Sequence, residues 1–253
     1  MLNLVKMPIV VCVCWFALAS SAQELYVAVA SNFAKPIQAI GTQFTQETHI
    51  KVRYALAASG ALYAQIKAGA PFDIFLSADA RTPQLLSQEG LAVPSSQITY
   101  AKGKLVLWSK DTRLIDKNGE VLKKASFKRI ALANPKLAPY GKAAQEALLR
   151  LGLYDALKSK IILTENISQV FQYVSTQNVE LGFIAYSQLP ELGEDALAVK
   201  GSYWIVPSSL YPPIEQDAIV LNKGSTNPAA AQFMQFLKRQ DIKSMIAAQG
   251  YDI

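Results

Sequence analysis

This chain repeats one local pattern: an apolar segment, a short turn rich in serine, glycine or asparagine, and then an amphipathic helix. The first unit has the β-rich segment Glu24–Ala30, the turn Ser31-Asn32 and a helix signal at Lys35-Pro36, where proline is tolerated in the first turn. Alternating strands and helices are typical of parallel sheets covered by helices. The pattern therefore predicts an α/β fold.

Further apolar segments are predicted strands, and helices follow several of them. The predicted strands are Lys51–Ala55, Phe72–Leu76, Lys104–Trp108, Arg129–Ala133, Leu181–Tyr186 and Asp217–Leu221. Predicted helices cover Ala61–Ala68, follow Gly141 and Asn166, and include a late one with Ala230, Phe233, Met234 and Leu237 on its apolar face. Such sheets bind ligands at the carboxyl ends of their strands, so the turns are the place to seek a site.

Four turns could gather the free backbone N–H groups of helix starts around one ligand. They contain Ser31-Asn32, Ser59-Gly60, Pro139-Tyr140-Gly141 and Asn166-Ile167. The first N–H groups of a helix have no intrahelical acceptor and lie at the positive end of its dipole. A serine taken alone is most often a simple N-cap. Four helix starts facing one point, however, would make an anion site without any charged side chain.

Groups suited to catalysis are scarce. His49 is the single histidine, and a Ser–His–acid triad would have to use it. The sequence contains no G-x-S-x-G, S-x-x-K, GxGxxG or P-loop motif. Asp73, Asp79 and Asp217 could form a hard-metal cluster, but their places beside strand ends favour capping or structural pairing. We therefore expect a protein that is not an enzyme and that has no cofactor.

Residues 1–22 have the layout of a secretory signal peptide, with Lys6, an apolar run at 8–19 and small residues up to Ala22. The run is shorter than the about 20 apolar residues that a membrane helix needs. We expect cleavage after Ala22, a periplasmic location and no membrane anchor. Both cysteines of the chain lie in the removed segment, so the mature protein would have no thiol.

The charge of the chain argues against a nucleic-acid partner. The formal net charge is +6 and falls to +5 when Lys6 is removed, and the basic residues form no block. This mild excess could help to attract an anion, although ordinary solvation of the surface is the favoured explanation. About 230 mature residues can bury a large core as one or two domains.

The turns lie in segments that resemble the periplasmic molybdate-binding proteins of ABC importers. These segments are VAVASNF at Val27–Phe33, ASGALYAQIKAGAPFDIFLSAD at Ala58–Asp79, GKLVLWS at Gly103–Ser109, NPKLAPYG at Asn134–Gly141 and LGFIA at Leu181–Ala185. The resemblance covers essentially the whole mature chain and implies a two-lobed periplasmic-binding-protein fold. Each lobe would be a mostly parallel sheet flanked by helices, and two crossing strands near Gly103–Trp108 and Pro213–Leu221 would join them. Lobe I would comprise residues 23–103 and 217–253, and lobe II residues 104–216.

The resemblance also implies which residues hold the oxyanion. Ser31 and Ser59 would donate their hydroxyls, and backbone N–H groups would come from Asn32, Ser59, Tyr140 and Ile167. No metal cation is implied, because molybdate would be held through its oxygens by these same residues.

The implied function is capture of molybdate or tungstate by a monomer that delivers it to an ABC permease and its ATPase in the inner membrane. Some members place a ligand-contacting tyrosine where this chain has Ala185. Tyr186 is one residue further along the strand and points to the opposite face, so we exclude it. Two alternatives stay open, namely binding of sulfate, thiosulfate or phosphate on the same fold and an atypical exported hydrolase. Glu165, beside Ile167, is the one acid near the proposed contacts.

Overall fold

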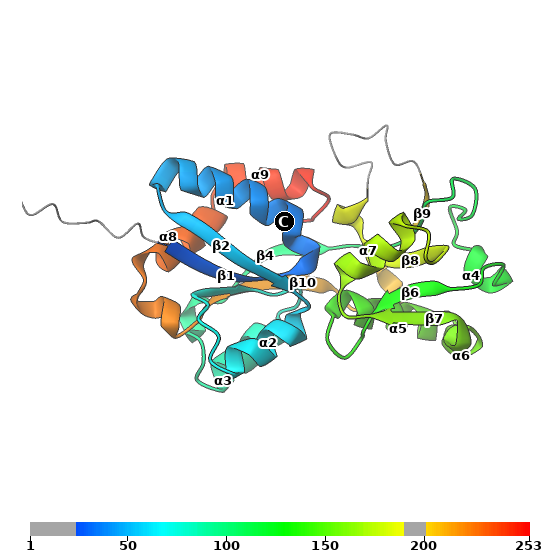
Figure 1. Ribbon diagram of the computed structural model, residues 1–253, viewed down its shortest axis with the longest axis horizontal. Coiled ribbons are helices and arrows are strands. Elements are labelled where there is room, and N and C mark those ends of the chain that lie inside the picture. Colours follow the sequence, from blue (N-terminus) through cyan, green and yellow to red (C-terminus); the bar gives the residue numbers. More distant parts are fainter. Residues whose placement is uncertain (1–23, 190–200) are drawn as a thin grey trace, which may run out of the picture.

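The computed structural model describes residues 24–189 and 201–253 of the chain. Two five-stranded sheets lie side by side along the long axis of the molecule, each flanked by helices (Figure 1). We call the part of the protein built on each sheet a lobe. The predicted signal peptide and its cleavage site after Ala22 lie outside the described residues. No helix within the described ranges is long and apolar enough to cross a membrane.

The first lobe contains the sheet with strand order β2-β1-β3-β10-β4. Its strands are β1 (Glu24–Ala30), β2 (Lys51–Ala57), β3 (Ile74–Leu76), β4 (Ile98–Gly103) and β10 (Ile214–Val220). Its helices are η1 (Ser31–Phe33), α1 (Ala34–Thr48), α2 (Ser59–Lys67), α3 (Arg81–Gln88), α8 (Pro228–Leu237) and α9 (Gln240–Ala248). The short 3-10 turns η2 (Pro94–Ser96) and η7 (Lys223–Thr226) complete it.

The second lobe contains the sheet with strand order β7-β6-β8-β5-β9. Its strands are β5 (Leu105–Ser109), β6 (Ile130–Ala133), β7 (Ile161–Thr164), β8 (Leu181–Ala185) and β9 (Ser202–Ile205). Its helices are α4 (Val121–Lys124), α5 (Pro139–Arg150), α6 (Tyr154–Leu157) and α7 (Ile167–Ser175), with 3-10 turns η3 (Lys158–Lys160), η4 (Tyr186–Gln188) and η6 (Ser208–Leu210).

Both sheets are mixed, with one reversed strand in each. In the first sheet β10 runs antiparallel to both of its neighbours, while β1, β2 and β3 are parallel. In the second sheet β5 is the reversed strand, and β6, β7 and β8 are parallel. Each reversed strand is the one that enters its sheet from the other lobe. The predicted two-lobed fold with mostly parallel sheets is confirmed in this form.

Within the described ranges the chain passes between the lobes twice. Lys104 alone separates β4 from β5, and residues 206–213 lead from β9 back to β10. The lobe limits at residues 104 and 217 remain a proposal. Ile214, at the start of β10, already pairs with Gly103 in the first sheet.

Strands in the centre of each sheet are apolar on both faces because helices cover both sides. In β1, Leu25, Val27 and Val29 pack with the helices of one layer, α1, α8 and α9. Ala28, which points the other way, packs in the layer that contains α2 and α3. The strand predicted at Glu24–Ala30 is therefore confirmed, and both of its faces are buried from Val27 onward.

Several elements escaped the sequence analysis, and three of them are edge strands. β4, β7 and β9 lie at the outer edges of the sheets, and each has half-buried or exposed residues beside its buried ones. They are short or contain polar residues, so no long apolar run marked them in the sequence. The turn predicted at Ser59-Gly60 is already helical, because α2 begins at Ser59.

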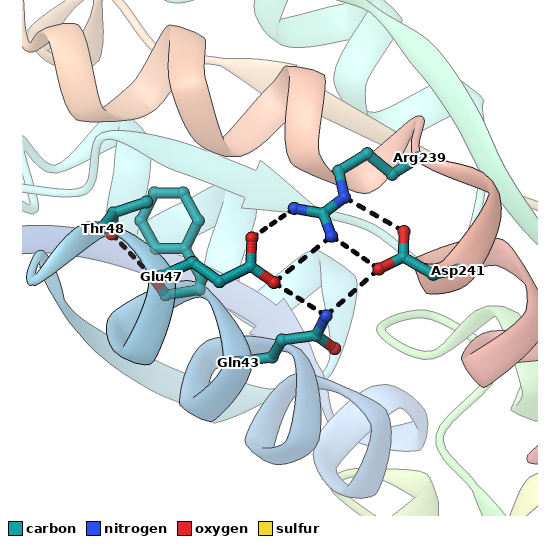
Figure 2. A network of polar contacts seen from close by, with 6 residues as sticks. Gln43, Glu47, Thr48, Arg239 and Asp241 are labelled. Atoms are coloured by element: carbon teal, nitrogen blue, oxygen red, sulfur yellow. Dashed lines mark hydrogen bonds and ion pairs between the residues drawn. The ribbon is translucent and has the colours of Figure 1, made fainter.

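The last helix of the chain is tied to α1 by a surface network (Figure 2). The Arg239 guanidinium donates to the carboxylates of Glu47 and Asp241, and the Gln43 amide donates to the same two acids. Hydrogen bonds from Arg239 lower the pKa of Glu47 and of Asp241. The network is therefore intact at neutral pH and is lost as the pH falls through these lowered values. Its exposure to water limits its contribution to stability.

Candidate anion-binding site

A small cavity lies between the two lobes, at the carboxyl ends of the parallel strands. The space open to the centre of a water molecule is about 10 Å³, close to the minimum that one water needs. Its lining contains all five residues proposed from the sequence, and the full set is Ala30, Ser31, Asn32, Ala58, Ser59, Ala78, Ala138, Pro139, Tyr140 and Ile167. A cavity of this size is far too small for a sugar or a peptide.

Four backbone N–H groups at the cavity belong to helix starts. Ser59 and Ile167 are the first residues of α2 and α7, Tyr140 is the second residue of α5, and Asn32 lies in η1. Within the described ranges no backbone acceptor is found for these four N–H groups. Because the first turn of a helix has no intrahelical acceptor, these donors are available to a ligand.

Neighbouring N–H groups of the same helices are already occupied. The Gly60 N–H donates to the Leu137 carbonyl at 2.9 Å. The N–H groups of Ser168 and Gln169 donate to the Asn166 side chain at 3.0 and 3.1 Å. Asn166 is thus the N-cap of α7 and leaves the Ile167 N–H as the donor facing the cavity.

The two serines do not act as N-caps. Ala30 and Ala58 occupy the N-cap positions, and neither helix start has a side-chain cap. The Ser59 hydroxyl instead accepts a hydrogen bond from the Ala78 N–H at 3.0 Å, which leaves its proton for a ligand. Ser31 is 5% exposed and lies beside the same cavity. The N-cap interpretation of these serines is therefore wrong, because each serine lies inside its helix.

No acidic or basic side chain is found among the residues that line this cavity. Positive potential therefore comes from the helix starts and from oriented N–H groups. Burial raises the pKa of the Tyr140 hydroxyl well above its ordinary value, so the group stays neutral at physiological pH. Glu165 is exposed, and its carboxylate accepts from the Gln169 amide at 3.3 Å. Tyr186 does not line the cavity either.

A wider groove of about 380 Å³ adjoins the cavity and shares three of its lining residues. Arg81 lines it from the first lobe, and Lys136 and Lys142 line it from the second. The groove contains one acid, Asp79, whose carboxylate accepts hydrogen bonds from Thr82. The approach to the cavity is therefore cationic, which favours the entry of an anion.

The aspartates considered as a metal cluster are each engaged within the protein. Asp73 accepts from the Tyr26 N–H at 2.8 Å, and Asp217 accepts from Gln97 and Thr99 at 2.7 and 2.8 Å. His49 is exposed and ends α1 in a left-handed conformation with φ of 60°. In the described part of the chain, no three acids, histidines or cysteines come together as a metal site.

One residue beside the site was missed in the sequence. Gln216 is fully buried in β10, where its side chain contacts Asn32 and Tyr140. A glutamine inside an otherwise apolar strand is the signal that could have indicated it, because buried polar groups need partners.

A donor-lined cavity between two α/β lobes is the arrangement of a protein that encloses a small anion. The chain belongs to a family described as bacterial extracellular solute-binding proteins, whose sequence profile matches residues 25–252. This membership indicates binding and transport of a solute rather than catalysis.

Named relatives support the assignment. A molybdate-binding protein of Azotobacter vinelandii is 47% identical over 237 residues, which cover 94% of this chain and 93% of the relative. One of Rhodobacter capsulatus is 45% identical and covers 93% of this chain and 90% of its own length. The solved structure of the Azotobacter vinelandii periplasmic molybdate-binding protein superposes with a TM-score of 0.86 at 36% identity, over 90% of this chain and 99% of that one.

Proposed function

We propose that this protein captures molybdate or tungstate in the periplasm and delivers it to an ABC permease and its ATPase in the inner membrane. Molybdate would be the transported solute, not a resident cofactor, and the protein would have no catalytic role. It would act as a monomer after removal of residues 1–22. The names of the relatives and the solute-binding family support this proposal.

One observation carries the proposal: the small cavity is lined by hydrogen-bond donors and by no charged side chain. Ser31 and Ser59 would donate hydroxyl protons, and Asn32, Ser59, Tyr140 and Ile167 would donate backbone N–H groups. Hydrogen bonds to a charged partner contribute about 1.5–3 kcal/mol each. Six such contacts would sum to about 9–18 kcal/mol, and the cost of dehydrating the dianion would offset part of this sum.

Closure of the lobes would complete the shell of donors around the ion. The Gly60 N–H donates to the Leu137 carbonyl across the two lobes at 2.9 Å, and the Ser168 hydroxyl donates to the Ser31 carbonyl at 3.1 Å. The chain links at Lys104 and at residues 206–213 are the places where the lobes can hinge. An open form would admit the ion to one lobe, and the second lobe would then close over it.

The absence of a carboxylate from the described lining of the cavity discriminates against protonated anions. Phosphate near neutral pH carries a proton that needs an acceptor in the site, and no carboxylate is found in this cavity's lining. An unsatisfied polar contact of this kind costs about 1–3 kcal/mol. Glu165, the one acid near the contacts, is exposed and bonded to Gln169.

Titration calorimetry with several oxyanions near neutral pH tests the proposal. We expect molybdate and tungstate to bind most tightly, then sulfate, then phosphate. Sulfate is fully deprotonated, but its shorter bonds would leave several donors out of reach. Phosphate binding as tight as that of molybdate would mean that an acid reaches the ligand, and the assignment would have to be abandoned.

Ser59→Ala should weaken molybdate binding about 10- to 150-fold, because it deletes a hydroxyl donor to a charged ligand. Ser77→Ala is the matched control. Ser77 is also buried and its hydroxyl also accepts one backbone hydrogen bond, from Asp79 at 3.3 Å, but it does not line the cavity. Titration calorimetry with molybdate should show a loss of affinity in Ser59→Ala and almost none in Ser77→Ala. Equal losses of affinity in the two variants would show that the site is misplaced.

A further inference from the structure

A buried polar network adjoins the cavity through Asn32 and Tyr140, which line it. Its centre is Gln216, which is 0% exposed and lies at a bulge in β10, the strand that returns from the second lobe. A buried amide in an apolar strand is costly unless all its polar atoms are paired. The partners of Gln216 therefore indicate what it is for.

The Gln216 amide joins one residue from each wall of the cavity. Its Oε1 accepts from the Asn32 side-chain amide at 2.8 Å, and its Nε2 donates to the Tyr140 hydroxyl at 3.2 Å. Asn32 belongs to the first lobe and Tyr140 to the second, and each has a backbone N–H at the cavity. The same amide thus holds the side chains of two proposed backbone donors.

The other crossing strand also holds Tyr140. Gly103 ends β4 and pairs with Ile214 of β10. A Cβ at Gly103 would overlap the Tyr140 hydroxyl and would lie 2.8 Å from Gln216 Nε2. The Tyr140 hydroxyl therefore sits against both strands at the point where the chain passes between lobes.

Asn32 is held from a second direction. The Tyr251 hydroxyl donates to the Asn32 carbonyl at 2.8 Å and accepts from the Asn32 amide at 3.1 Å. The Ser187 hydroxyl, which follows β8 of the second lobe, donates to the Tyr251 hydroxyl at 2.9 Å. Burial raises the pKa of Tyr251, so this hydroxyl stays neutral and can donate.

We propose that Gln216 is a positioning residue that couples lobe closure to the anion site through the Tyr140 hydroxyl. The inference rests on the proposed function. When the lobes are closed, the Gln216–Tyr140 hydrogen bond orients the Tyr140 and Asn32 peptides toward the ion. When the lobes are open, water replaces this bond on both groups. Removal of the Tyr140 hydroxyl therefore raises the free energy of the closed, ligand-bound form more than that of the open form. In the closed form Gln216 Nε2 would lose its partner, whereas in the open form water would replace it.

Tyr140→Phe tests this, because it removes the hydroxyl and keeps the backbone N–H at the cavity. We expect molybdate affinity to fall about 10- to 100-fold, with little change in the melting temperature of the ligand-free protein. Tyr26→Phe is the control, because it makes the same change away from the cavity and from both links between the lobes. Tyr26 is half-buried in β1, its hydroxyl also has one hydrogen bond, to the Glu24 carboxylate at 3.4 Å, and it lines no part of the cavity. The affinity of this control variant for molybdate should stay within about threefold of wild type.

A double-mutant cycle with Gln216→Met separates coupling from general damage. If the two groups act through their mutual hydrogen bond, Tyr140→Phe should weaken binding much less in the Gln216→Met background than in the wild-type background. Small-angle scattering with and without molybdate would report closure in each variant. Tyr140→Phe decides the question even where Gln216→Met does not fold.

The outcomes separate this inference from the proposed function. Wild-type protein that binds none of the oxyanions would overturn both. Wild-type protein that binds molybdate, together with Tyr140→Phe that binds as tightly as Tyr26→Phe, would overturn the inference alone. Independent, additive losses in the double-mutant cycle would do the same, because they would show no coupling between Gln216 and Tyr140.

Discussion

Molybdate at a thousandfold excess over its Kd should stabilise the mature protein by about 4 kcal/mol, because a ligand that binds only the native state adds RT ln(1 + [L]/Kd). For a chain of this length the melting temperature should rise by about 8 to 16 °C. The physical source is the donor set of the cavity, whose N–H groups lack acceptors within the described ranges. Thermal unfolding monitored by circular dichroism or calorimetry measures the shift directly.

Chloride at equal concentration is the control for ionic strength and should leave the melting temperature unchanged. The ligand should affect both lobes, because it would bridge them, so the two should unfold in one transition in its presence. A melting temperature that moves with neither molybdate nor tungstate contradicts the proposed function.

Gly141→Ala should weaken molybdate binding by at least about 100-fold, the equivalent of about 3 kcal/mol of overpacking. Gly141 lies in the first turn of α5, and an added Cβ would overlap the Ala133 carbonyl oxygen and lie 2.6 Å from its carbon. The nearest atoms all belong to the backbone of Ala133 and Asn134, so no flexible side chain can give way. The start of α5 must therefore move off β6, and the Tyr140 N–H moves with it.

Gly41→Ala makes the same change in another helix and is the matched control. There an added Cβ would meet only the Val52 side chain, at an ordinary 3.5 Å. Alanine favours a helix more than glycine by about 1 kcal/mol, so this variant should be as stable as wild type or more stable, with unchanged affinity. Calorimetry and thermal unfolding on both variants provide the comparison. Unchanged molybdate affinity in Gly141→Ala would show that the α5 start does not contact the ion.

Sequence pattern predicted best the strands whose own residues form a continuous apolar run. β1 has the limits predicted for it, and β6 and β8 agree within one residue at either end, because buried central strands are continuous apolar runs. The limits of β10 were less well predicted, since the strand begins at Ile214 rather than at Asp217. Its first residues, including Gln216, are partly polar, and their partners lie far away in the sequence.

The sequence by itself determined the central strands, the helices that follow several of them and the residues of the turns, because propensity, capping and hydrophobic period act over a few neighbouring residues. Only the tertiary structure decided that Ser31, Asn32, Ser59, Tyr140 and Ile167 line one cavity and that Glu165 stays outside it. Whether these residues meet at one cavity depends on how the two sheets pack and where the chain crosses between them. The pairing of Gln216 with Asn32, 184 residues away, is a contact of that kind, for which no local pattern exists.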